Sequence, residues 1–210
     1  MLAILIEVLA KMFSIVNPMG ALPMYLTLTA HYSEAERLRT VRNTSIYFVL
    51  VLLAFFWGGS YILAFFGLDI NALRIAGGLV ILNSGFSLMN DNFNQSRAMN
   101  PEVQKEALEK PDISFSPLAM PLLSGPGSIS LMIGFFAQYQ SWEDRLLITA
   151  MIFLMGGVVY SIFRMAPLVY RYLGVGGLKA GSRVMSFITM AIGVQFIILG
   201  ILALVKEYAK

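Results

Sequence analysis

The chain has 210 residues, of which 58% are hydrophobic and only 13% are charged, and its mean hydropathy is +0.73. In soluble domains roughly a quarter of the residues are charged, so we predict a protein embedded in the lipid bilayer. The net charge of +3 is typical of basic cytoplasmic loops in such proteins, and no nucleic acid partner is expected. The absence of cysteine excludes disulfides, thiolate catalysis and cysteine-based zinc sites.

Apolar stretches of about 20 residues, the length that crosses a bilayer, occur repeatedly along the chain. We predict six spans, at residues 2–30, 40–66, 70–89, 116–139, 145–170 and 181–205. The first begins without the basic segment and small-residue cleavage site of a signal peptide, and we interpret it as a retained span. The predicted fold class is therefore an all-α polytopic membrane protein with six transmembrane helices.

A long polar connector at residues 91–115 separates two predicted three-helix repeats, 1–90 and 116–210. Basic residues concentrate in this connector and in the loops that follow the first and fifth spans. Because positively charged loops stay on the cytoplasmic side, we predict a multi-pass protein of the cell (inner) membrane. Both of its termini are expected to lie outside.

The two halves share short matching segments. Pro18-Met19-Gly20 in the first span and Pro126-Gly127-Ser128 in the fourth are 108 positions apart, and Arg74 and Arg183 open the third and sixth spans 109 positions apart. Because each half holds an odd number of spans, a second half of the same fold would be inserted upside down. The pattern predicts an inverted repeat, which is typical of secondary transporters.

The first and fourth spans contain proline and glycine in the middle of their apolar runs, in "NPMGALP" and "MPLLSGPGSIS". Proline removes a backbone donor and clashes with the preceding turn, so both helices are predicted to be discontinuous. Loose backbone groups in lipid cost several kcal/mol each, and such breaks persist only where protein buries them or water reaches them. A plain proline kink explains one break, but two breaks in matching places favour a binding site.

The polar groups near the two breaks are small and uncharged. The N-terminus of a half-helix attracts an anion, and the carbonyls that end the other half-helix attract a cation, so a small zwitterion fits both. Asn17 is predicted to cap the second half-helix and to contact ligand, whereas Ser14 has the alternative of bonding a carbonyl in its own preceding turn. The candidate substrate-binding residues are Ser14, Asn17, Pro18, Gly20, Ser124, Gly125, Gly127 and Ser128.

Four further polar residues are candidates for gating or ion coupling. Glu7 and Lys11 are four residues apart and can pair on one helix face, either as an interfacial pair or as part of an external proton path. Arg164 lies deep in "YSIFRMAPLVY" and is a candidate for a cytoplasmic gate. Gln195 in the sixth span is the fourth candidate, although a hydrogen bond between helices is the expected role of both Gln195 and Thr189.

The segments "NPMGALP", "MPLLSGPGSIS", "RIAGG" and "FRMAP" closely resemble the MarC family of integral membrane proteins, which includes the SnatA small neutral amino acid transporters. The resemblance covers essentially the whole chain. It implies six spans in inverted repeats, discontinuous first and fourth helices, and transport of glycine or alanine driven by an ion gradient. Its two motifs fall on Asn17, Pro18, Gly20 and Pro23, and on Pro121, Leu122, Gly125, Pro126 and Gly127.

The sequence does not identify the coupling ion, and it leaves more than one function possible. A proton or sodium gradient is expected, and no other cofactor is predicted. An intramembrane protease would need a histidine base, an aspartate pair or a zinc site, but His31 falls in a polar loop and no aspartate lies inside a predicted span. No enzyme activity is therefore predicted, whereas a passive channel and an exporter of the LysE type are alternatives to an amino acid transporter.

Overall fold

The computed structural model describes residues 2–89 and 112–208, and these segments are helical apart from short turns. The described parts contain no strand, which confirms the all-α prediction. In chain order the elements are α1 (Leu2–Val16), α2 (Pro18–Leu28), α3 (Glu34–Phe65), α4 (Ile70–Met89), η1 (Ser114–Leu123), α7 (Pro126–Gln138), α8 (Trp142–Arg164) and α9 (Ala166–Tyr208).

Five helical segments of the described chain are long and apolar enough to cross a membrane. One of them, Leu5–Leu28, runs through the α1–α2 break. The pair η1 and α7, bent by 66° at their junction, makes a sixth span when it is counted as one. The first and the fourth spans are interrupted, as the proline and glycine pattern predicted.

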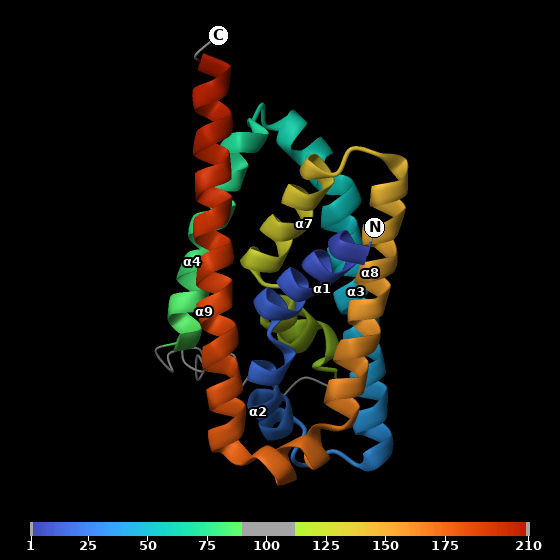
Figure 1. Cartoon of the computed structure of the whole chain (residues 1–210). Coiled ribbons are helices and arrows are strands. Elements are labelled where there is room, and N and C mark those ends of the chain that lie inside the picture. The colour runs from blue at the N-terminus through green and yellow to red at the C-terminus, as the bar shows by residue number, and fades with distance from the viewer. Residues whose placement is uncertain (1, 90–111, 209–210) are drawn as a thin grey trace.

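The interrupted helices lie in the centre of the bundle (Figure 1). α4 packs along α9 on one side of them and α3 packs along α8 on the other, while α7 contacts both α3 and α4, and α1 contacts both α8 and α9. The α2–α3 turn and the first part of α9 lie at one end of the bundle, and the α3–α4 and α7–α8 turns lie at the opposite end (Figure 1).

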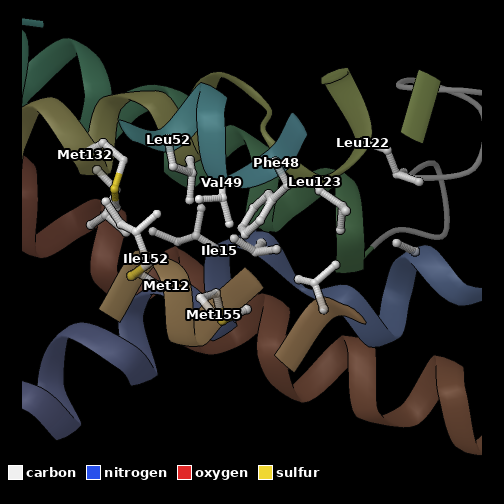
Figure 2. Packing of buried hydrophobic residues seen from close by; sticks show 14 of the residues in the cluster. Met12, Ile15, Phe48, Val49, Leu52, Leu122, Leu123, Met132, Ile152 and Met155 are labelled. Atoms are coloured by element: carbon white, nitrogen blue, oxygen red, sulfur yellow. The ribbon is translucent and has the colours of Figure 1, made fainter. Parts of the chain in front are cut away.

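The buried core connects the first interrupted helix to α3 and α8. Figure 2 shows Met12 and Ile15 of α1 among the side chains of those two helices and of η1. Phe48 of α3 and Met155 of α8 are fully buried there. Residues 14–18 are all buried, so the α1–α2 break lies inside protein, where its backbone groups are shielded from lipid.

The largest differences from the predicted spans lie between the fifth and the sixth. The fifth span was predicted to reach residue 170, but α8 ends at Arg164 and α9 begins at Ala166. Pro167 explains the difference, because proline is accommodated in the first turn of a helix and breaks a helix interior. Residues 171–180, predicted as a loop, belong to α9, which is interrupted where Gly174 adopts a φ of 60°.

Candidate functional site

The first break is a single left-handed residue between two helices. Asn17 has φ 44° and ψ 62°, and Pro18 starts α2 directly after it. The Asn17 Oδ1 accepts a hydrogen bond from the Gly20 N–H at 3.2 Å, and its Nδ2 donates to the Ser182 Oγ of α9 at 2.8 Å. Asparagine tolerates this backbone conformation better than most residues, and the predicted N-cap on α2 is confirmed.

Hydroxyl groups connect the end of α1 to α9. The Ser14 Oγ donates to the Met185 carbonyl at 3.0 Å, rather than to a carbonyl of its own preceding turn. Thr189 Oγ1 donates in turn to the Ser14 carbonyl at 3.0 Å, which satisfies an acceptor near the end of α1. The predicted interhelical role of Thr189 is therefore confirmed, and the broken span is fixed to α9 by side chains before the break and at the break itself.

The second break lies between η1 and α7 and is less completely paired. α7 starts at Pro126, and Gly125 before it provides no side-chain cap. The Ser128 Oγ donates to the Leu123 carbonyl across the break at 3.1 Å. The Ser124 Oγ is fully buried and has no hydrogen-bond partner among the described residues. A buried hydroxyl without a partner loses its hydration without compensation. The Ser124 hydroxyl is therefore available for a hydrogen bond at this end of α7.

The two breaks are neighbours in space. A Cβ atom placed on Gly127 of α7 would lie 3.4 Å from the Ile15 Cγ2, two residues before the first break. The first turn of α7 also presents the partial positive charge of a helix N-terminus. None of the four polar side chains nearest the breaks is charged, and all are buried: Ser14, Asn17, Ser124 and Ser128.

The backbone donors at the two breaks differ in availability. Both half-helix N-termini were predicted to attract an anion, but the Gly20 N–H is already bonded to Asn17. No side chain caps the first turn of α7, where the N–H groups of Gly127 and Ser128 lie. In this conformation the first turn of α7 therefore keeps N–H groups that no side chain caps, whereas the first turn of α2 is capped by Asn17.

The four gating or coupling candidates lie apart from the breaks. Glu7 and Lys11 form the predicted ion pair on α1, with the Glu7 side chain exposed. Arg164 is exposed at the end of α8 and donates to the Tyr160 hydroxyl at 3.2 Å. Gln195 is exposed on α9 and forms no hydrogen bond with another described residue, so the interhelical bond predicted for it is not made.

Sequence reasoning missed the contribution of α9 to the first break. Ser182 bonds Asn17, and the Met185 carbonyl bonds Ser14, although they are 165 and 171 positions apart in the chain. Ser182 lies in a small-residue stretch without a distinguishing motif, so its local sequence carries no signal. Thr189 was detectable because a hydroxyl inside an apolar span needs a partner.

The crowding at Gly20 leads to a first testable prediction. A Cβ on Gly20 would lie 2.6 Å from the Asn17 Nδ2 and 2.8 Å from the Ser182 Oγ, so Gly20→Ala separates that bonded pair. Leaving buried polar groups unpaired costs about 1–3 kcal/mol, and we expect a lower midpoint of thermal unfolding in detergent. Gly127→Ala is the matched control, because its nearest contact is an ordinary 3.4 Å. Equal midpoints for both variants would contradict the packing at the first break.

The fold and the two breaks define a class: a polytopic helical membrane protein whose polar centre is formed by interrupted helices. Residues 2–205 match the family model for MarC family integral membrane proteins. The chain belongs to this family. No solved structure matches it.

Relatives in distant organisms are similar over nearly the full length. A UPF0056 membrane protein of Buchnera aphidicola subsp. Schizaphis graminum is 38% identical over 95% of this chain and 92% of its own. A UPF0056 inner membrane protein MarC of Escherichia coli O1:K1 is 34% identical over 95% of each chain. A UPF0056 membrane protein of Methanocaldococcus jannaschii is 36% identical over 91% of this chain and 93% of its own.

Proposed function

We propose that the chain is a secondary transporter of small neutral amino acids, with glycine and alanine as substrates. The observation that carries the proposal is the pairing of two helix breaks whose buried polar side chains carry no charge. A zwitterion has no net charge but needs both donors and acceptors. Paired half-helix ends supply donors and acceptors without a buried charged side chain, whose desolvation would be costly.

The geometry suggests how each end of the substrate is held. The carboxylate meets the uncapped N–H groups of Gly127 and Ser128 and the unpartnered Ser124 Oγ. The ammonium group meets the Asn17 Oδ1, which has a second lone pair beyond its bond to Gly20. Tight packing around these groups favours a substrate with little or no side chain, which agrees with glycine and alanine.

Alternating access gives the buried site contact with each side of the membrane in turn. The helix pairings support this proposal, because they are those that a two-fold relation between the halves would produce: α4 with α9, α3 with α8, and each interrupted helix against the third helix of the other half. The inverted repeat itself stays a prediction. In this mechanism the two halves rock about the breaks.

The proposed location is the inner membrane. Its support is the printed name of the Escherichia coli relative, which calls that protein an inner membrane protein. The end of the bundle that holds the α2–α3 turn and the first part of α9 would lie in the cytoplasm, because basic residues concentrate there. Coupling to either a proton or a sodium gradient belongs to the proposal. Sodium would use oxygen ligands at the breaks, whereas Glu7 is the candidate for proton coupling.

Uptake of radiolabelled glycine into proteoliposomes tests the function directly, with proton and sodium gradients imposed separately. We expect saturable uptake that one of the two gradients stimulates and that unlabelled alanine inhibits. Uptake proportional to concentration, without saturation or competition, would indicate a passive channel instead. Absence of glycine uptake by folded protein, with export of another small solute, would favour a LysE-type exporter.

A further inference from the structure

A second polar site lies at the end of the bundle that holds the α2–α3 turn. A pocket of about 430 Å³ opens there between the end of α2, the start of α3 and the α8–α9 junction. Its inner wall is apolar and well packed, with the Tyr25 and Phe163 rings stacked at 4.8 Å between centroids. Tyr25 and Phe163 are buried, so this wall is a fixed surface rather than a loose gap.

Two arginines line the pocket from different helices. The Arg37 Nε and Nη2 donate to the carbonyls of Thr29 and Ala30 at 3.0 and 3.1 Å, which fixes the guanidinium over the end of α2. Arg164 approaches from the end of α8, and one of its terminal nitrogens donates to Tyr160. Each guanidinium has five N–H donors, so both retain donors beyond the bonds they make to described residues.

The other polar lining groups set the charge that the pocket accepts. Glu34 is the only acidic residue among the described residues that line the pocket, so the charged lining groups, two arginines and one carboxylate, sum to about +1. Tyr32 also lines the pocket, and burial, with smaller effects of Asp112 and Glu36, raises the pKa of its hydroxyl. The Tyr32 hydroxyl therefore stays protonated at neutral pH and can act as a donor.

We propose that this pocket binds a singly charged oxyanion, held between the guanidinium groups of Arg37 and Arg164. Planar guanidinium groups match the paired oxygens of carboxylates and phosphodiesters. Two kinds of ligand could supply such an oxyanion at this end of the bundle: a small free molecule with a carboxylate, or an anionic lipid with a phosphodiester headgroup. The site is separate from the helix breaks, so it does not depend on the proposed transport function.

Calorimetric titration of the full chain in detergent tests the site, with acetate and dihexanoyl phosphatidylglycerol as separate probes. We expect saturable binding of at least one probe, and at least tenfold weaker binding of that probe by Arg164→Gln. Arg171→Gln is the matched control, because Arg171 is an exposed arginine of α9 that does not line the pocket. Acetate binding alone identifies a free carboxylate as the ligand, and lipid binding alone identifies the headgroup.

Two further variants keep the outcome unambiguous. Arg164→Lys keeps the charge but loses the planar fork, and its affinity should fall between those of the wild type and Arg164→Gln. Ser124→Ala alters only the break site and should leave binding in the pocket unchanged. The proposal is overturned if neither probe saturates, or if Arg164→Gln binds as tightly as the wild type. Because glycine transport is not measured, failure here is distinct from failure of the transport function.

Discussion

Removing the Asn17 side chain is expected to abolish glycine uptake in proteoliposomes. Asn17 is buried, caps α2 through the Gly20 N–H and bonds the Ser182 hydroxyl of α9. In the proposed function the same side chain receives the substrate ammonium group. Its loss would therefore remove a ligand contact, a helix cap and the direct connection between the first break and α9.

The choice of replacement decides what the experiment shows. Leucine at a φ of 44° would add about 1–2 kcal/mol of backbone strain to the lost hydrogen bonds. Asn17→Leu therefore loses stability as well as function, and its inactivity alone would not identify a ligand contact. Asn17→Gly accepts the left-handed backbone without strain, and the cost of replacing an N-cap by glycine is only a few tenths of a kcal/mol.

We therefore expect Asn17→Gly to remain folded and to show background uptake, with a midpoint of thermal unfolding that is lowered by the loss of the Ser182 hydrogen bond but not by backbone strain. Asn17→Asp keeps the acceptor toward Gly20 and loses the donor to Ser182. It should retain the cap while adding a buried charge, so its uptake should also fall. Wild-type uptake by Asn17→Gly would contradict the ligand role of Asn17 and move the binding site elsewhere.

The parts of the site that the sequence predicts are those that depend on local chemistry. Pro18 and Pro126 have no backbone donor and are best accommodated in a first helical turn, so each break could be placed within a residue or two. Asn17 could be identified as a cap because the side chain and the N–H group it bonds are three residues apart. The cap therefore needed no knowledge of the tertiary structure.

The parts that the sequence does not predict depend on packing between distant segments. The partners of Asn17 and Ser14 on α9 follow from how α1 and α2 lie against that helix, which no local pattern encodes. Gln195 shows the opposite case: a polar residue in an apolar span suggested an interhelical bond, but its side chain is exposed on α9. Which face of a span is buried depends on its neighbours, and hydropathy alone does not reveal it.

Gly156 illustrates why the sequence does not reveal which glycine can be replaced by alanine without loss of stability. Gly156 and Gly157 are adjacent in the same helix, and nothing in the local sequence distinguishes them. A Cβ on Gly156 would collide with the Val49 side chain of α3, whereas a Cβ on Gly157 would meet nothing within 4 Å. Gly157, rather than Gly156, is therefore suitable as a control position for glycine substitutions.

Substitution of Gly78 is expected to have the largest effect on stability. A Cβ on Gly78 of α4 would lie 2.7 Å from the Gly193 carbonyl oxygen and 3.0 Å from the Ile197 backbone nitrogen of α9. The reverse contact is as close, since a Cβ on Gly193 would lie 2.8 Å from the Gly78 carbonyl oxygen. Backbone atoms in a packed interface cannot rotate away as a side chain does, so the helices must separate.

Gly78→Ala should therefore destabilise the protein by about 3 kcal/mol or more, at the upper end of overpacking effects. For a chain of this size that corresponds to a decrease of roughly 6–12 °C in the midpoint of thermal unfolding. Gly157→Ala should leave the midpoint unchanged or raise it slightly, because alanine has the better helix propensity and finds open space there. If Gly78→Ala unfolds at the same temperature as Gly157→Ala, α4 and α9 cannot approach each other as closely as the glycine contacts indicate.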